Sequence, residues 1–175
     1  MSLPTDAELN NSGVLKRRLI EARIAAPLIK AFAAEIGEDR AYAIAREVIT
    51  GIAREQGDAM AASVGGRTLP LFAGTLDRWT ADDALRISPL AQSDDVFAFD
   101  VTRCRYAEMY RELGIPELGA IFSCDRDRSL IEGFNGDVEL QRTQTIMNGA
   151  SHCDFRYALR RAPEVTPSPS QQQDR

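Results

Sequence analysis

A chain of 175 residues, 44% hydrophobic and 27% charged, fits one soluble globular domain with a buried core. Its net charge of −5 and its scattered Lys and Arg exclude a typical nucleic-acid-binding surface, which needs clustered positive charge. No apolar run approaches the roughly 20 residues that cross a bilayer, and the N-terminus lacks the pattern of a secretory signal. With three cysteines and no export signal, we expect a cytoplasmic protein with reduced thiols.

The first part of the chain predicts two long amphipathic helices. After Gly13, apolar residues recur at alternating steps of four and three: Leu15, Leu19, Ala22, Ala26, Ile29, Ala33 and Ile36. Pro27 either kinks this helix or opens a new one, and Gly37 ends it. A second helix is expected from about Glu38 to Ser63, before Gly65.

The buried face of the second helix is predicted from its apolar residues: Ala41, Ile44, Ala45, Val48, Ile49 and Ile52. Both helices are rich in alanine, which permits close packing. We expect the stripes to pack within their own domain, with a homo-oligomer through these helices as the alternative.

Residues Thr68 to Trp79 predict a short third helix or an ordered loop. A single Trp beside such a junction usually belongs to the core. We therefore expect Trp79 in the core, with the wall of a ligand pocket as the alternative.

The sequence period then changes to that of strands. Residues 84–90 and 96–102 predict an antiparallel hairpin, with Phe97, Phe99 and Val101 on one face of its second strand. Residues 104–113 predict a helix that ends at Gly114, and Pro116 opens another.

A final strand pair is predicted at the end of the folded region. Residues 138–147 alternate as a strand, Asn148-Gly149 is a tight-turn signal, and residues 153–159 form the partner strand. Cys153, Phe155 and Tyr157 share one face of that partner strand.

These elements predict an α+β fold, with N-terminal helices packed on a small, mostly antiparallel sheet that has inserted helices. We expect residues 1–160 to form one domain, helical over 13–80 and sheet-containing and catalytic over 84–160. Residues 161–175 are rich in Pro, Ser and Gln, which predicts a disordered tail.

The stretch from Cys104 to Tyr157 holds the residue types that do chemistry. It contains all three cysteines and the only histidine: Cys104, Cys124, Cys153 and His152. Four carboxylates accompany them: Glu108, Asp125, Asp127 and Asp154. Thiols, imidazole and acids either bind metal or act as nucleophile and base.

A metal site is one interpretation of this stretch. Three thiolates and an imidazole suit tetrahedral zinc, but the cysteines form no CxxC pair. His152 and Cys153 are neighbours on a strand and therefore point to opposite faces. A three-thiolate zinc site from Cys104, Cys124 and Cys153 stays open beside a site without any cofactor.

Nucleophilic catalysis is the other interpretation. Cys124 is followed by Asp125, Arg126 and Asp127, which supply a cation to favour the thiolate and acids to move protons. His152 could serve as a base only from a turn or a twisted strand. Against this stands the common role of free cysteine as a small buried apolar residue.

Two further placements follow from element periodicity. Glu108 lies one turn after Cys104 in the predicted helix, so the two would share a face. Arg156 faces opposite Cys153, which favours an ion pair outside any pocket.

The segments CRYAEMYRELG, ELGAIFSCDRD and the GFN–strand–TIMNG–HCDFRY ending, in this order, resemble the L-2-amino-thiazoline-4-carboxylic acid hydrolase family. The resemblance rests on Cys104, Cys124, Asp127, Gly149, Cys153, Asp154 and Phe155, and it covers about residues 96–159. The ending is also similar to four-vinyl-reductase-type small-ligand domains. Both imply helices packed on a small antiparallel sheet.

The family resemblance implies hydrolytic opening of a small nitrogen-containing heterocycle, such as a cyclic amidine, imide or lactam, at a C–N bond. We expect a small-molecule substrate and neither nucleic acid nor membrane as partner. The alternative is a non-catalytic small-ligand-binding or zinc-binding sensor module. Our catalytic candidates are Cys124, Asp127, His152 and Cys153. Our substrate-binding candidates are Cys104, Glu108, Asp125 and Asp154.

Overall fold

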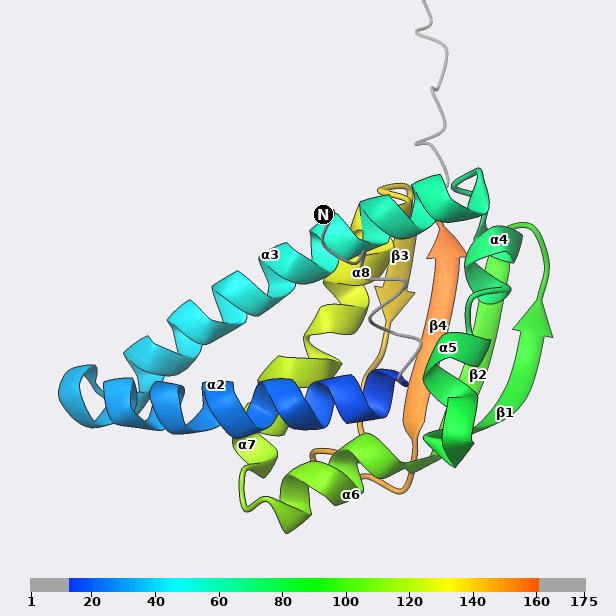
Figure 1. Ribbon diagram of the computed structural model, residues 1–175. Coiled ribbons are helices and arrows are strands. Elements are labelled where there is room, and N and C mark those ends of the chain that lie inside the picture. The colour runs from blue at the N-terminus through cyan, green and yellow to red at the C-terminus, as the bar shows by residue number, and fades with distance from the viewer. Residues whose placement is uncertain (1–12, 161–175) are drawn as a thin grey trace, which may run out of the picture.

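The computed structural model describes residues 13–160 (Figure 1). The tail expected over residues 161–175 lies outside this range. In the described range, helices pack on one face of a four-stranded antiparallel sheet with strand order β1-β2-β4-β3. The strands are β1 (Leu85–Gln92), β2 (Val96–Cys104), β3 (Val138–Gln141) and β4 (Cys153–Leu159). The α+β prediction is confirmed.

The sheet is apolar on one face and polar on the other, as the alternation along β2 and β4 predicts. In the register of these two strands, Phe97 is paired with Tyr157 and Phe99 with Phe155. On the opposite face, Arg156 donates to the Asp100 carboxylate at 2.7 Å, so the ion-pair role expected for Arg156 is confirmed. The helices cover the apolar face.

Two long helices, α2 (Val14–Ile36) and α3 (Glu38–Val64), form an antiparallel hairpin that projects away from the sheet as an arm (Figure 1). Gly37 alone connects them, with a φ of 85° that suits glycine. Its N–H donates to the Ala33 carbonyl at 2.9 Å. Helix α2 continues through Pro27 as one element, so the suggestion that a new helix begins there is wrong.

The predicted apolar faces of the arm are only partly buried. Ala22 and Ala26 of α2 are buried, as are Ala41 and Ala45 of α3. The larger members of the predicted faces divide into half-buried residues (Leu15, Leu19, Ile29 and Ile49) and exposed residues (Ile36, Ile44, Val48 and Ile52). At the exposed residues the prediction is wrong, because the tip of the arm extends beyond the body that would cover it.

Helix α8 (Arg126–Phe134) crosses α3 in direct backbone contact. A Cβ atom on Gly57 would lie 2.0 Å from the Leu130 carbonyl oxygen, and one on Gly133 would lie 1.9 Å from that of Arg54. Neither helix could approach the other so closely with any other residue at these two positions. The crossing fixes the start of α8 over the apolar face of the sheet.

Short helices complete the cover. They are α4 (Leu69–Ala73), α5 (Asp77–Thr80), the 3-10 turn η2 (Ala81–Asp83), α6 (Arg105–Glu112), α7 (Pro116–Gly119) and the π-helical turn η3 (Ala120–Cys124). The hairpin of β1 and β2, the helix after Cys104 and the strand from Cys153 are confirmed.

The strand predicted over residues 138–147 is too long. Strand β3 ends at Gln141, and residues 142–152 form a loop with a turn at 146–149. The Asp154 carboxylate holds this loop by accepting the backbone N–H groups of Thr143 and Gln144 at 3.0 and 2.9 Å. These bonds replace the strand pairing that the sequence pattern suggested.

Among residues 13–160, none of the helices combines the length and apolar character that a membrane span requires.

Candidate functional site

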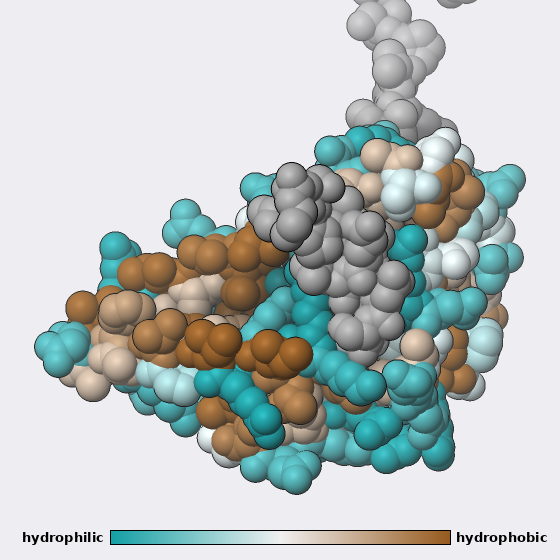
Figure 2. Space-filling view, viewed as in Figure 1, coloured by the Kyte–Doolittle hydropathy of each residue, from teal (hydrophilic) through white to brown (hydrophobic). Residues whose placement is uncertain are grey.

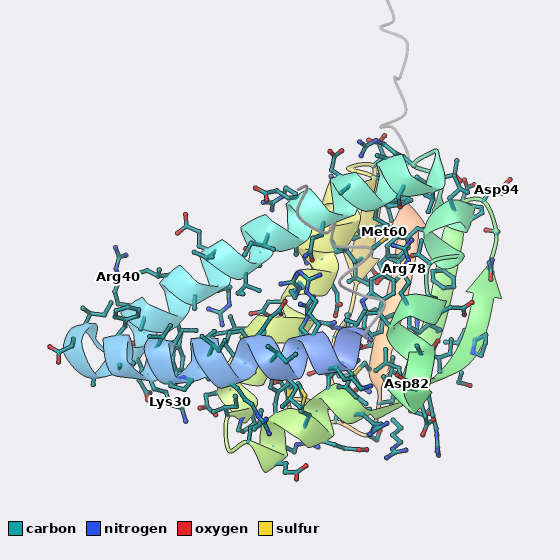
Figure 3. The ribbon with its side chains drawn as sticks, in the orientation of Figure 1. Lys30, Arg40, Met60, Arg78, Asp82 and Asp94 are labelled. Carbon is teal, nitrogen blue, oxygen red and sulfur yellow. The ribbon has the colours of Figure 1, made fainter. Side chains whose placement is uncertain are left out.

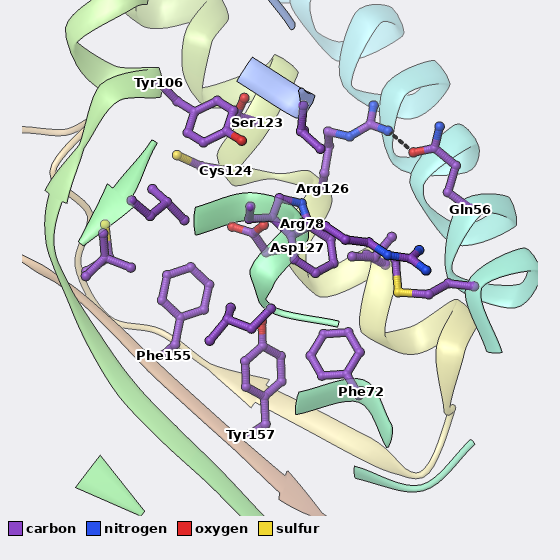
Figure 4. Close-up of a pocket in the computed structure, with 18 of the residues that line it drawn as sticks. Gln56, Phe72, Arg78, Tyr106, Ser123, Cys124, Arg126, Asp127, Phe155 and Tyr157 are labelled. Carbon is purple, nitrogen blue, oxygen red and sulfur yellow. Dashed lines mark hydrogen bonds between the residues drawn. The ribbon is translucent and has the colours of Figure 1, made fainter. Parts of the chain in front are cut away.

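A cavity of about 550 Å³ lies between the helices and the apolar face of the sheet (Figure 4). Strands β1, β2 and β4 form one wall, and the sheet ends of α2 and α3 form another. The π-turn η3 and the first turn of α8 close it with Arg142 from the loop after β3. A cavity of this size suits a small organic ligand.

Aromatic side chains form much of the cavity wall. Phe72 of α4 packs edge-on against Tyr157 of β4, with ring centroids 5.2 Å apart, and Phe99 stacks on Phe155 at 5.0 Å. Trp79 also lines the cavity, which agrees with the alternative considered for it. This wall is apolar and presents ring faces to any ligand.

Asp127 and Arg142 form an ion pair at the cavity wall. A second nitrogen of the guanidinium donates to the Cys124 carbonyl at 2.9 Å, and the group lies over the Phe155 ring, 5.1 Å from its centroid. Arg142 is therefore held by three neighbours from different elements.

The Asp127 side chain remains 31% accessible although it lies deep between the elements, because it faces the cavity. Burial raises the pKa of this carboxyl, while the Arg142 guanidinium opposes the rise. Burial works against the charge of Arg142, but the charges of Asp127 and Cys124 and the hydrogen bond to Asp127 together raise the Arg142 pKa. A carboxyl with a raised pKa beside a fixed cation is suited to exchanging protons.

Cys124 reaches the cavity from the end of the π-turn. The turn is closed by an i→i+5 bond, from the Asp125 N–H to the Ala120 carbonyl at 2.9 Å. Such turns often occur at functional sites because they shift the side chains that follow. Burial, and next the Asp127 charge, raise the pKa of the Cys124 thiol.

The thiol of Cys124 is therefore protonated at neutral pH. The sequence suggested that Arg126 would favour a thiolate here, but the cation that acts on this sulfur is Arg142, and burial outweighs it. A reaction at Cys124 needs a base that takes the proton during attack.

A polar cluster forms one end of the cavity. The Tyr106 hydroxyl is buried and has no hydrogen-bond partner among the described residues. The Ser123 hydroxyl lies 3.0 Å from that of Tyr110. A buried hydroxyl without a partner is costly unless a ligand or water satisfies it.

Two buried arginines line the same cavity. Arg18 pairs with Glu21 at 2.5 Å, and Arg126 contacts the side-chain oxygen of Gln56. Burial, followed by the Arg18 charge, lowers the pKa of Arg126 to about 10. Arg126 thus stays charged at neutral pH and is well placed to bind an anion.

The other two cysteines line the cavity with sulfurs that accept backbone N–H groups. The sulfur of Cys104 accepts the Ala107 N–H at 3.4 Å, and that of Cys153 accepts the Ile146 N–H at 3.2 Å. Burial raises the pKa of Cys104 to about 11 and also raises that of Cys153. Over residues 13–160, no three His, Cys, Asp or Glu side chains are arranged to hold a metal ion. The three thiols do not fit a zinc site.

Four of the predicted site residues do not line the cavity. Glu108 pairs with Arg103 at 2.9 Å and Asp125 with Arg46 at 2.7 Å. Cys104 caps the N-terminus of α6 through its sulfur, whereas Glu108 points to solvent, so the two do not form a common patch.

The remaining two serve the loop before β4. The Gln144 side-chain nitrogen lies 3.0 Å from each ring nitrogen of His152. Burial works against the charge of Asp154, but hydrogen bonds from Thr143 and Gln144 lower its pKa to about 2. Cys104, Cys124, Cys153 and Asp127 are thus the predicted residues that the fold brings to one cavity.

The family model for L-2-amino-thiazoline-4-carboxylic acid hydrolase matches residues 17–157, which spans the arm, the sheet and every residue of this cavity except Val14. The chain belongs to the L-2-amino-thiazoline-4-carboxylic acid hydrolase family. The expected family membership is therefore confirmed, and with it the class of hydrolases. No curated protein matches the sequence.

Two solved structures are similar to this family member at low sequence identity, and the first of them shares its fold. Subunit 3 of the trafficking protein particle complex from Naegleria fowleri, covalently bound to palmitic acid, is 10% identical with a TM-score of 0.50. The match covers 83% of this chain and 96% of that one. The phenol-responsive sensory domain of the transcription activator PoxR, with phenol, is 12% identical with a TM-score of 0.45, over 91% and 76% of the two chains.

Several cavity residues of this hydrolase-family chain were not predicted from the sequence: Arg18, Tyr106, Ser123 and Arg142. One signal was present, because Arg142 follows Val138 and Leu140 at the spacing of an apolar strand face. A charged residue at such a position is a candidate for a buried role. Nothing in the local pattern around Arg18 marked it as a cavity residue.

Proposed function

We propose that this chain opens a nitrogen-containing heterocycle by hydrolysis inside the cavity, and that a cyclic amidine such as an aminothiazoline carboxylate is its substrate class. The observation that carries the proposal is the position of Asp127 and Cys124, which face one cavity beside the cation Arg142. These groups supply a nucleophile, a proton acceptor and a fixed positive charge.

In the proposed reaction, the Cys124 sulfur bonds to the amidine carbon while its proton passes to the Asp127 carboxylate. Asp127 returns this proton to the ring nitrogen, which takes a second proton from the exocyclic amino group as that group becomes an imine. The ring nitrogen then departs as an amine, which leaves an S-linked open chain on Cys124. Water attacks the same carbon and gives a proton to Asp127, and the thiol leaves and is reprotonated from Asp127. The net change is the addition of one water and the loss of one ring bond.

Arg142 keeps the Asp127 carboxylate ionised enough to accept the first proton. Without this cation, burial alone would favour the neutral acid. The raised pKa that remains makes Asp127 an adequate donor to the departing nitrogen. The same pair therefore supports both proton transfers.

The substrate carboxylate binds at the polar end in this proposal. Arg126 is buried and charged in the wall of the same cavity, and the Tyr106 hydroxyl lacks a partner in the described structure. A substrate carboxylate that accepts from both would satisfy the Tyr106 hydroxyl, add an ion pair with Arg126 and place the ring beside Cys124. Cys104 and Cys153 act as cavity wall, and we assign no chemical step to His152, Glu108, Asp125 or Asp154.

The test is turnover of an aminothiazoline carboxylate by the Cys124→Ser variant. We expect turnover to be abolished while the circular dichroism spectrum and melting temperature stay near those of the wild type. Cys153→Ser is the matched control, because it alters a wall thiol of the same cavity. Near-normal turnover by Cys124→Ser would contradict the covalent step, and water activated directly by Asp127 would replace it.

A further inference from the structure

The cavity is larger and more apolar than a thiazoline carboxylate requires. That molecule is a single five-membered ring with small polar substituents, whereas a volume of about 550 Å³ is typical of pockets for drug-sized ligands. The ring and its carboxylate would fill only the part of the cavity near Tyr106, Cys124 and Asp127. Most of the apolar wall would then face empty space or water.

The surplus wall is built from aromatic side chains of separate elements. Phe97 packs on Phe99 with centroids 5.0 Å apart and on Tyr157 at 6.0 Å, and Phe72 faces Tyr157 at 5.2 Å. Figure 4 shows Phe72, Phe155 and Tyr157 away from the end that holds Tyr106, Ser123 and Cys124. The cavity therefore has a reactive polar end and an apolar end.

We propose that the substrate of this chain is a heterocyclic carboxylate with a large apolar substituent, which lies among Phe72, Phe97 and Tyr157 while the ring lies at Cys124. This inference rests on the proposed function, since it takes the position of the ring from it. Burial of the substituent against the aromatic wall supplies binding free energy that the small polar ring cannot supply.

The experiment compares aminothiazoline carboxylates that carry unbranched alkyl or phenylalkyl substituents of increasing length. We expect kcat/KM to rise about four-fold for each added methylene until the cavity is filled. A flat series, or fastest turnover of the unsubstituted ring, would overturn the inference and leave the proposed function standing.

Calorimetric binding of the same series keeps the two proposals separable. If no member is turned over, an affinity that rises with substituent length supports the apolar ligand class while the hydrolysis proposal fails. An affinity that does not rise with length, or an absence of binding, overturns the inference as well.

Cavity-filling variants locate the substituent. Leu76 and Leu130 both line the cavity, so Leu76→Phe and Leu130→Phe should shorten the longest substituent accepted and leave turnover of the unsubstituted ring within about two-fold. Leu71→Phe makes the same change on α4 outside the cavity and should leave the whole series unchanged. Equal length profiles in all three variants would overturn the placement.

A second observation stands apart from the cavity. Large apolar side chains lie exposed along the arm (Figure 2). They are Ile20, Ile24, Leu28, Phe32 and Ile36 of α2 and Ile44, Val48 and Ile52 of α3, which we call the arm stripe. Their exposure ranges from 40% at Ile52 to 65% at Ile24.

The arm stripe is too large for an ordinary monomer surface. With roughly 200 Å² for each fully exposed large apolar residue, similar to the area of an aromatic side chain, the exposed fractions of these eight residues amount to on the order of 800 Å² on one chain. The largest apolar patch of a typical monomer is about 300–600 Å². A standard interface takes about 800 Å² from each partner.

We propose that the arm stripe is covered by the arm of a second copy of this chain. The area matches what a stable dimer needs, and both partners of a two-fold dimer can present the same stripe. The net charge of −5 gives no attraction to an anionic bilayer, which disfavours membrane binding by the stripe.

The test is the molar mass of the full chain by light scattering after size-exclusion chromatography. We expect a dimer for the wild type and a folded monomer for the Ile24→Glu, Phe32→Glu double variant. Leu90→Glu, at a similarly exposed apolar residue on β1, should remain dimeric. A monomeric wild type, or co-sedimentation of the wild type with phosphatidylserine vesicles, would overturn the proposal.

Discussion

Helices α2 and α3 form the arm of this protein and also reach into its body, yet their apolar side chains have opposite environments in the two places. At the sheet end, α2 and α3 turn Arg18 and Gln56 toward a cavity, and Met60 lies at this end as well (Figure 3). At the other end, where Lys30 and Arg40 lie, their large apolar residues face solvent. An apolar stripe is thus buried only where the fold provides a surface to cover it.

The two apolar surfaces also differ in shape. The cavity wall is concave and aromatic, with polar groups at one end, which suits a small amphipathic ligand. The arm stripe is exposed along two helices and is aliphatic apart from Phe32, which suits another helical surface. If the comparison is correct, changes in the body should alter chemistry without altering assembly, and changes in the arm should do the reverse.

The largest effect is expected from Asp127→Asn. Loss of a general base typically costs 10²–10⁴-fold, so kcat should fall by about that factor while the molar mass is unchanged. Asp125→Asn is the matched control, because that carboxylate pairs with Arg46 outside the cavity. Equal activity of the two variants would contradict the assignment of Asp127.

The pH dependence of kcat/KM should show the raised pKa of Asp127. Asp127 accepts the first proton and must be ionised, so the rate should fall about ten-fold for each pH unit below its pKa. Since burial raises that pKa, the fall should begin above the ordinary value of about 3.9.

The Arg142→Gln variant sharpens this test. Arg142 opposes the rise in the Asp127 pKa, so its removal should move the fall in rate to higher pH. A fall centred at or below the ordinary aspartate value in the wild type would contradict the role of Asp127.

Helix α3 has one glycine packed against α8, Gly57, and one with open space beside it, Gly51, so the same substitution can be compared at both. Gly57→Ala should lower the free energy of unfolding by about 3 kcal/mol, because the new Cβ would meet the Leu130 backbone at 2.0 Å. Gly51→Ala meets nothing within 4 Å and should raise it by up to about 1 kcal/mol. Urea denaturation measures both, and effects of the same sign would contradict the close α3–α8 crossing.

An effect smaller than that of Gly57→Ala is expected near the loop before β4. Asp154→Asn should lower the free energy of unfolding at pH 7 by about 1–2 kcal/mol, after allowance for solvent screening. Its folded pKa of about 2 lies below the unfolded value, so this stability is present above about pH 4 and is lost as the pH falls through about 2. A pH dependence of stability equal in wild type and variant would contradict the bonds from Thr143 and Gln144.

Periodicity predicted much of this fold but little of the site geometry. The alternation of Phe97 and Phe99 gave the inner face of the sheet correctly. The predicted stripe from Leu15 to Ile36 is buried or half-buried except at Ile36, because spacing shows which residues share a face but not whether anything covers the end of that face.

The candidate site was predicted in part for a related reason. Cys104, Cys124, Cys153 and Asp127 were selected by residue type, and the fold brings them to one cavity. His152 and Glu108 were selected by the same criterion but lie outside the cavity, because residue type does not show where a side chain points in the folded protein. Arg142 acts through contacts with Asp127 and Cys124, which are far from it in sequence, so only the tertiary structure reveals it.

The most direct test of the central claim is hydrolysis of an aminothiazoline carboxylate in isotopically labelled water, followed by mass spectrometry. The wild type should yield an open-chain carbamoyl product that carries one labelled oxygen, and Asp127→Asn should yield almost none. If the wild type binds the substrate but forms no such product, or if Asp127→Asn forms it equally fast, the hydrolysis at Asp127 and Cys124 is contradicted.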